Sequence, residues 1–363
     1  MFKNIPYIVN IMDKGFKFIS GSFMIDARGS FLNGAGIKPA ENENITEPKN
    51  FWTAEGYFPY VSSQAWRKWL RNTVIEEADW ERSEIRILKK NKKGNVSQFA
   101  TQCDPIKYPE DDLFGYMAAK SKSKKKTSEE EGEEEEDDNE DNNNVSSVMR
   151  AAPFKSSILL STEPVRTLPK DEAFVHLENG TPLPYSTEFY YNFLRANFSI
   201  DYERVGTIKD VGDRIEMEDV HIQQYLSAKK IVHDIEHGYY ALADTNERKK
   251  RVGALLRALG VMRGGAKLAQ FNTSVSPAAI ILVGLSSGNL IFSRAFFSKN
   301  NKPSIDVEYV KQTLKEYNDR IVTPVYLGFM NGTFENESEI KDLEQIKLGT
   351  PREAIEGFIS CLP

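Results

Sequence analysis

Three stretches of the chain place apolar residues with a helical period. Residues 64–78 carry one stripe, which predicts an amphipathic helix that begins after Ser62 or Ser63, both suitable N-caps. Residues 246–260 carry a second stripe and end on Gly260, an expected helix stop. The stripes are Trp66, Trp69, Leu70 and Val74 in the first helix, Val252, Leu255, Leu256 and Leu259 in the second, and Val307, Val310, Leu314, Tyr317 and Ile321 in a third near the C-terminus.

Other stretches have the pattern of strands. Residues 16–25 alternate, with a change of face near Ser20-Gly21-Ser22 that predicts a β-bulge. Residues 278–285 form an unbroken apolar run, typical of a strand covered on both faces. Two more strands are expected at 156–161 and 188–199, a loop at 26–36, and a hairpin between 162 and 187, where Asn179-Gly180 is a turn pair.

In chain order these elements are strand, helix, strand, strand, helix, strand. This order predicts an α+β fold of the split βαβ, ferredoxin-like kind, which RNA-recognition folds share. Long stretches between the elements leave room for further strands, so the order favours this fold without excluding others.

The net charge of −6 is concentrated in one segment. Residues 120–144 hold 5 Lys and 11 Asp or Glu, so the rest of the chain is neutral. The segment has no apolar residue whose burial could offset the entropy of ordering it, and we expect a solvated loop. An acidic mimic of nucleic acid is the alternative. The overall charge therefore does not exclude a nucleic-acid partner.

Several classes of protein are not expected. Cys103 and Cys361 are the only cysteines, too few for a disulfide framework or a four-cysteine zinc site. No apolar run is long enough to span a bilayer, and the first residues lack the pattern of a secretory signal, so we expect a soluble, cytoplasmic protein. The four histidines and the serines match no metal-binding or hydrolase motif. We expect no metal, no cofactor and no catalytic residue.

The start of the first helix is the sharpest candidate site. The first amides of a helix and its positive dipole end attract anions. A phosphate above the first turn would meet hydroxyl, amide and cationic groups together, from Ser62, Ser63, Gln64, Arg67, Lys68 and Arg71. The alternative is an ordinary capped helix with a solvated basic face, and composition alone favours it.

A second candidate follows the second helix. Gly264 and Gly265 remove two adjacent side chains, so a nucleic-acid backbone can approach the main chain closely, and Arg263 and Lys267 supply charge on either side. The spacing is not that of a Walker A loop. A helix end followed by a turn is an equally good interpretation.

Five ordered blocks together resemble the CRISPR-associated backbone subunit of type I-B Cascade, in the DevR-type family. The resemblance covers roughly residues 16–285, and its most specific block begins at Gly56. The blocks are SFLNGAG (30–36), GYFPYVSSQAWRKWLR (56–71), DLFGYM (112–117), RAAPF (150–154) and FYYNFLRANFSIDYERV (189–205).

The resemblance implies an RNA-recognition-like palm with an inserted finger region and a thumb hairpin. The palm would be built from three pieces of the chain and followed by a C-terminal extension packed on it. The implied parts are palm at 1–84, finger at 85–149 including the loop 120–144, a palm strand at 150–161, thumb at 162–187, palm at 188–290 and the extension at 291–363.

The resemblance also implies a function. Copies would stack head to tail along CRISPR RNA beside other Cascade subunits, and the guide would pair with target DNA. The residues of both candidate sites would hold guide phosphates with Asn33 nearby, and Phe174, Val175 or Leu177 would wedge the guide. Two alternatives stay open. One is a related subunit that cleaves target RNA through a thumb-side or loop aspartate with a divalent metal, for which Asp26, Asp210 and Asp213 are candidates. The other is a stand-alone regulatory protein without nucleic acid.

Overall fold

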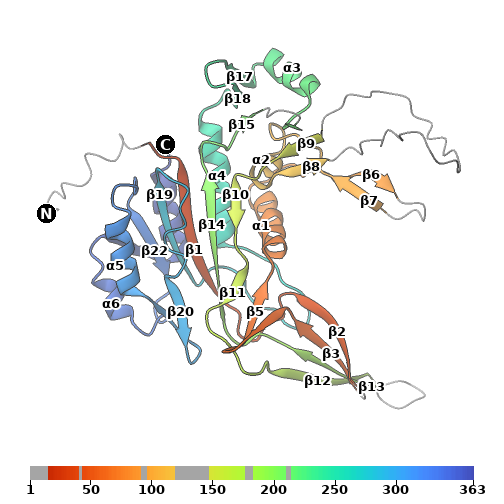
Figure 1. Cartoon of the computed structure of the whole chain (residues 1–363), viewed down its shortest axis with the longest axis vertical. Helices are drawn as coiled ribbons and strands as arrows, with labels where there is room; N and C mark the ends of the chain where they lie inside the picture. Colours follow the sequence, from red (N-terminus) through yellow and green to blue (C-terminus); the bar gives the residue numbers. More distant parts are fainter. Residues whose placement is uncertain (1–14, 41–42, 91–95, 119–146, 176–182, 210–213) are drawn as a thin grey trace, which may run out of the picture. The chain divides into compact units, whose positions relative to one another are not determined.

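The computed structural model describes residues 15–40, 43–90, 96–118, 147–175, 183–209 and 214–363 (Figure 1). The charged loop 120–144, Leu177 and the turn pair Asn179-Gly180 lie outside them. Contacts between Cα atoms divide the chain into two compact units, each described by itself below. Unit 1 contains residues 1–80, 153–205 and 246–363, and unit 2 contains residues 81–152 and 206–245. The resemblance implied that residues 206–245 belong to the palm, whereas the structure groups this segment with residues 81–152.

Unit 1 is built on a sheet of nine strands. Its four central strands, β19, β1, β14 and β11, are antiparallel throughout. In chain order, β1, β11, β14 and β19 are the first to fourth strands of the βαββαβ order expected from sequence. Side by side in the sheet, they therefore lie in the order fourth, first, third, second. From edge to edge the path is β23 (Ile346–Gly349), β22 (Val325–Phe329), β19 (Ala279–Leu285), β1 (Phe18–Asp26), β14 (Phe193–Asp201), β11 (Leu159–Ser161), β5 (Gly56–Val61) and β4 (Asn50–Thr53), with β10 (Phe154–Ser156) also paired to β14.

Helices and a hairpin cover the two faces of this sheet (Figure 1). On one face α1 packs against α4 and α4 against α7, and Trp66 of α1 meets the rings of Phe23 and Phe154 edge-on. On the other face Met24 and Ile281 pack with Val310 of α5 in one buried cluster. The elements are α1 (Ser63–Glu77), α4 (Asn246–Gly260) and α7 (Pro351–Ser360), and on the opposite face α5 (Val307–Glu316), α6 (Glu337–Lys341), β20 (Phe296–Lys299) and β21 (Lys302–Ile305). The helices at 64–78 and 246–260 and the doubly covered strand at 278–285 are thus confirmed.

The bulge expected in β1 is absent, because its register against both neighbours is continuous. Gly21 interrupts the apolar pattern for a different reason: a β-carbon there would lie 2.3 Å from Cζ of Phe198. The hydroxyl of Ser22 donates to the Ala196 carbonyl at 3.3 Å, and that of Ser20 accepts from the Ile291 amide at 3.4 Å. The small polar residues therefore fit a regular strand that is buried from Ile19 to Ile25.

Three expected boundaries were wrong. The expected strand 156–161 is interrupted at residues 157 and 158, so it forms two separate strands, β10 and β11. The expected strand 188–199 is broken at residues 189–192, where Tyr190 forms an isolated bridge with Ser30. The expected loop 26–36 ends at Asn33, because β2 finds hydrogen-bonding partners in β3 despite its glycines. These strands belong to a four-stranded sheet in the order β12 (Lys170–Val175), β13 (Leu183–Glu188), β3 (Glu43–Pro48) and β2 (Gly34–Ala40). β12 and β13 form the hairpin expected between 162 and 187.

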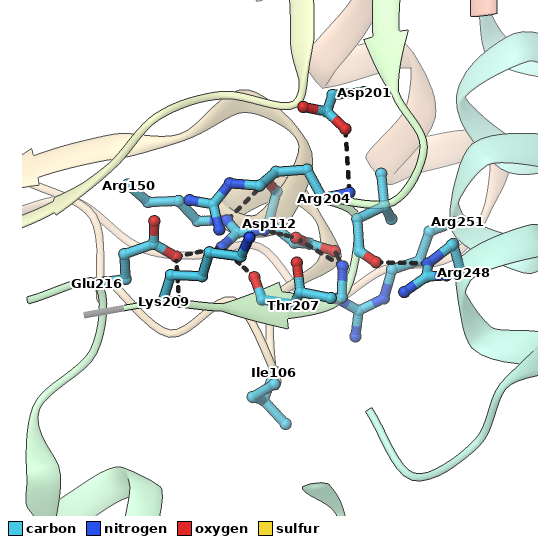
Figure 2. A network of polar contacts seen from close by, with 12 residues as sticks. Ile106, Asp112, Arg150, Asp201, Arg204, Thr207, Lys209, Glu216, Arg248 and Arg251 are labelled. Atoms are coloured by element: carbon cyan, nitrogen blue, oxygen red, sulfur yellow. Dashed lines mark hydrogen bonds and ion pairs between the residues drawn. The ribbon is translucent and has the colours of Figure 1, made fainter. Parts of the chain in front are cut away.

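The described residues of unit 2 form short strands and two helices, and they include a buried ion-pair network. Figure 2 shows the Arg150 guanidinium group beside the carboxylates of Asp112 and Glu216. Arg150 also donates to the Thr207 carbonyl at 2.7 Å, and the side chains of Arg150 and Asp112 are fully buried. The elements are β6 (Arg86–Lys90), β7 (Val96–Ala100), α2 (Pro109–Phe114), β8 (Tyr116–Ala118), β9 (Ser147–Arg150), β15 (Thr207–Ile208), β16 (Arg214–Ile215), α3 (Asp219–Ser227), β17 (Ile231–Asp234) and β18 (Tyr239–Leu242).

Within the described ranges, no helix combines the length and the apolar character needed to cross a membrane.

Candidate nucleic-acid interface

The start of α1 keeps the features of an anion site. Ser62 occupies the N-cap position with extended backbone angles (φ −61°, ψ 148°), and its side chain makes no capping hydrogen bond. The first turn holds no acidic residue that would compete for an anion. Ser62 and Ser63 are half-buried, whereas Gln64 and Lys68 are exposed. These four residues are therefore accessible beside the helix amides.

The guanidinium group of Arg67, which the sequence predicted as a phosphate contact, is hydrogen-bonded to the sheet. Its Nη1 donates to the Phe154 carbonyl of β10 at 2.6 Å, and its guanidinium group lies 5.2 Å from the centre of the Phe154 ring. Burial, with a smaller contribution from the nearby charge of Arg71, lowers the pKa of Arg67 to about 10, so the group stays charged at neutral pH. Arg67 thus anchors α1 to the sheet, with the half-buried Arg71 close to it.

The glycine loop at residues 263–267 is attached to α1. A β-carbon on Gly264 would lie 2.2 Å from Cγ of Trp69, so only glycine fits against this indole ring. The Arg263 amide donates to Thr73 Oγ1 of α1 at 3.1 Å. The Arg263 guanidinium group forms ion pairs with two carboxylates near the end of α1, Glu76 at 2.8 Å and Glu77 at 2.6 Å. The structure therefore brings the two candidate sites together, with the charge of Arg263 already balanced.

The same loop also contacts the segment after β1. Gly265 has a φ of +123°, a conformation that favours glycine, and the next amide, of Ala266, donates to the Phe31 carbonyl at 3.0 Å. Lys267 Nζ donates to Thr187 Oγ1 at 2.7 Å and lies 5.1 Å from the centre of the Phe31 ring. Burial lowers the pKa of Lys267. Lys267 thus links the loop to the base of the hairpin β12–β13.

Tyr190 joins Asn33 to the strand that precedes α1, a role that sequence analysis missed. Its hydroxyl donates to Asn33 Oδ1 at 2.8 Å and lies 3.1 Å from the Tyr60 carbonyl oxygen. Burial raises the pKa of Tyr190, which keeps the hydroxyl protonated and able to donate. No local signal distinguished this tyrosine from its neighbours in the aromatic run 189–193.

Two of the three expected wedge residues, Phe174 and Val175, lie at the end of β12. The backbone pairs Phe174 with Pro184 and Val175 with Leu183 in the antiparallel hairpin. Leu177, the third candidate, lies outside the described residues.

Of the aspartates of the cleavage alternative, Asp26 is already ion-paired, and Asp210 and Asp213 lie outside the described residues. Asp26 accepts from Arg28 Nε at 2.8 Å and from its Nη2 at 2.6 Å, so both carboxylate oxygens are occupied. Throughout the part of the chain that the structure describes, no three His, Cys, Asp or Glu side chains are grouped so that they could hold a metal ion.

Comparisons with known proteins agree with this architecture. The chain is similar to a solved structure described as a "CRISPR RNA-guided surveillance complex, pre-nicking", with a TM-score of 0.55 and 10% identity over 95% of this chain and 99% of that chain. A second, a "CRISPR RNA-guided surveillance complex", has a TM-score of 0.43 and 9% identity over 94% and 98% of the two chains. The first likeness defines the class: an α+β protein with the fold of a chain from such an assembly.

The family follows from the sequence itself. Residues 43–291 match the model of the CRISPR-associated negative auto-regulator DevR/Csa2 family. Because this match covers more than half of the chain, the protein belongs to that family, as the ordered blocks indicated. A search of curated proteins gives no match.

Proposed function

We propose that this protein is a non-catalytic backbone subunit of a type I-B Cascade complex in the cytoplasm. Copies of it stack head to tail along CRISPR RNA and hold the guide by its sugar-phosphate backbone. The exposed guide bases then pair with target DNA, and other Cascade subunits complete the assembly. Head-to-tail stacking uses two different surfaces of each copy, and it gives a filament where the rotation between neighbouring copies does not close into a ring.

The strand order supports an RNA-recognition-like palm in unit 1. The fourth, first, third and second strands lie side by side and antiparallel, which is the order a ferredoxin-like βαββαβ unit requires. In this proposal unit 2 supplies the finger region and the hairpin β12–β13 is the thumb. Phe174, Val175 and Leu177 remain the candidates for the residue that wedges the guide.

The single observation that carries the proposal is the attachment of the glycine loop to α1. Gly264 packs on Trp69 of α1, seven residues after the N-cap Ser62. In this proposal the helix-start amides, the glycine main chain and several cations form one surface of unit 1. Such a surface contacts phosphate and ribose and requires no particular base. A subunit that must accept any spacer sequence needs this property.

The structure changes the weight of the individual contacts. Lys68, Gln64, Ser62 and Ser63 are accessible and remain the primary phosphate contacts. Arg67 supports the site indirectly, because it anchors the helix to the sheet. Arg263 must break its ion pairs with Glu76 and Glu77 before its guanidinium group can bind a phosphate. Asn33, Arg71, Gly264, Gly265 and Lys267 complete the proposed interface.

Co-expression with a CRISPR repeat–spacer array tests the proposal. We expect a small RNA of defined length to co-purify, with nuclease protection at regular intervals, and the particle to shrink after nuclease treatment. Identical elution of treated and untreated samples without any bound RNA would support the stand-alone regulatory alternative instead. Cuts in target RNA at regular spacing that disappear in Asp26→Ala would support the cleaving alternative; the Arg28 ion pair argues against it.

A further inference from the structure

The hairpin formed by β4 and β5 leaves large aromatic rings in water. This aromatic hairpin (residues 50–61) carries five aromatic side chains, and its most exposed ones are Trp52 at 65% and Phe51 at 40%. Exposed rings grouped on one element indicate a binding surface, because single exposed apolar residues are scattered on ordinary surfaces. The five are Phe51, Trp52, Tyr57, Phe58 and Tyr60.

The rings are arranged as two cross-strand pairs. Phe51 lies opposite Phe58 with ring centres 5.6 Å apart and planes 12° apart, which is a parallel stack. Trp52 lies opposite Tyr57 at 4.4 Å and 63°. Because successive residues of a strand point to opposite faces, the hairpin presents one pair on each face. Each pair fixes an exposed ring in place, so a flat surface is ready to accept another planar ring.

The charge around the hairpin favours a polyanion. Residues 49–71 hold four basic residues and one acidic residue, although the whole chain carries −6. The basic residues lie at both ends of this segment: Lys49, whose carbonyl accepts from the Tyr60 amide at 2.9 Å, and Arg67, Lys68 and Arg71 on α1. A ligand with both negative charge and planar rings is a nucleic acid.

The hairpin is also continuous with the candidate phosphate site. β5 ends at Val61, and Ser62 begins the helix start two residues after Tyr60, roughly 7 Å further along an extended chain. A strand whose phosphates lie over the first turn of α1 therefore has its bases within reach of the aromatic hairpin.

We propose that the aromatic hairpin is a base-stacking site for single-stranded nucleic acid, with Phe51 and Trp52 as the rings on which bases stack. The inference deepens the proposed function and rests on it for the identity of the strand. Stacking accepts every base, because each base has a flat aromatic face, so it is compatible with a guide of any sequence.

The test uses the full chain freed of bound RNA, with a mixed-sequence single-stranded RNA and an abasic strand of the same length as probes. Trp52 is one of four tryptophans. Its fluorescence emission is therefore obtained by subtracting the emission of Trp52→Phe from that of the wild type. We expect RNA to quench this emission and the abasic strand to leave it unchanged. Replacing both rings in Phe51→Ala/Trp52→Ala weakens binding of the intact strand by about 5- to 150-fold per lost stack and leaves binding of the abasic strand unchanged.

Two variants guard against a trivial loss of folding. Phe51→Tyr/Trp52→Phe keeps both rings and retains RNA binding. Phe99→Ala removes a ring that is 62% exposed on the hairpin β6–β7 of unit 2, and RNA binding stays at the wild-type level.

The outcomes separate this inference from the proposed function. Equal RNA affinity of wild type and Phe51→Ala/Trp52→Ala overturns the base-stacking site and leaves the guide-binding proposal standing. A change of Trp52 emission with protein concentration, in the absence of nucleic acid, assigns the surface to contacts between copies and also overturns it. Quenching by RNA in vitro, without any RNA that co-purifies from cells, supports the stacking site while the proposed function fails.

Discussion

Gly264 lies against the indole ring of Trp69, so closely that a β-carbon would come within 2.2 Å of the ring. The two residues are 195 positions apart, and their contact holds the glycine loop on the first helix of unit 1. Close packing thus joins the two parts of the candidate interface, beside the ion pairs of Arg263 with Glu76 and Glu77. This contact gives the first prediction.

Gly264→Ala should displace the loop from α1. Forcing a methyl group into a packed contact costs about 1–3 kcal/mol in the free energy of unfolding, and the displaced loop loses its place beside the helix start. We expect a lower melting temperature together with reduced guide retention after affinity purification.

Gly34→Ala is the matched control, since its β-carbon would meet the nearest atom, Cζ of Phe31, at 3.5 Å, an ordinary contact distance. Guide retention in Gly264→Ala equal to that of this control would show that the loop does not take part in binding.

Lys68 and Arg67 are neighbours with different expected roles. Lys68 is exposed, so Lys68→Glu should weaken RNA binding and leave the melting temperature almost unchanged. Arg67→Ala removes a charged hydrogen bond to the Phe154 carbonyl and should lower the free energy of unfolding by about 1.5–3 kcal/mol.

Paired measurements of thermal unfolding and RNA affinity distinguish the two residues. A destabilised Lys68→Glu, or an Arg67→Ala of wild-type stability, would contradict the assigned roles.

Removing the carboxylates that pair with Arg263 should strengthen RNA binding. In Glu76→Gln/Glu77→Gln the guanidinium group is released from both ion pairs, and two negative charges leave the interface. One additional phosphate contact on a single strand steepens the dependence of log K on log salt by about 0.7. Exposed ion pairs contribute little to stability, so folding should be unaffected.

Titrations at several salt concentrations measure that slope. Glu308→Gln, which opens an exposed pair with Lys311 on α5, serves as control and should leave it unchanged. An unchanged slope in the α1 variant would remove Arg263 from the interface.

Sequence patterns predicted the central elements well, because burial imposes them. The stripes of Trp66, Leu70 and Val74 and of Leu255 and Leu259 are buried at helical spacing, and the run 279–285 is buried at every position. The α+β class that the order of these elements predicted is also confirmed.

The misses have a common physical origin in contacts between distant positions. Gly21 accommodates the ring of Phe198, which a local pattern cannot distinguish from a bulge. Arg67 and Arg263 carry the expected charge, but their partners lie 87 and 186 residues away in sequence, at Phe154 and Glu77. A sequence shows which side chains are cationic, whereas the carbonyl and carboxylate groups that pair with these cations are visible only in the folded chain.

The last prediction concerns the buried network of unit 2. Arg150→Met removes the Arg150 cation from the buried Asp112 and Glu216 carboxylates, and breaking a buried pair in this way typically costs about 3–5 kcal/mol. Calorimetry of the full chain should show a large fall in the temperature of one transition. Adding Asp112→Asn to Arg150→Met removes one of the buried carboxylate charges and should restore part of the lost stability.

Lys107→Met, which opens the exposed ion pair with Glu81, is the control and should cause a much smaller change in stability. Equal effects of Arg150→Met and Lys107→Met would show that the network does not stabilise this unit.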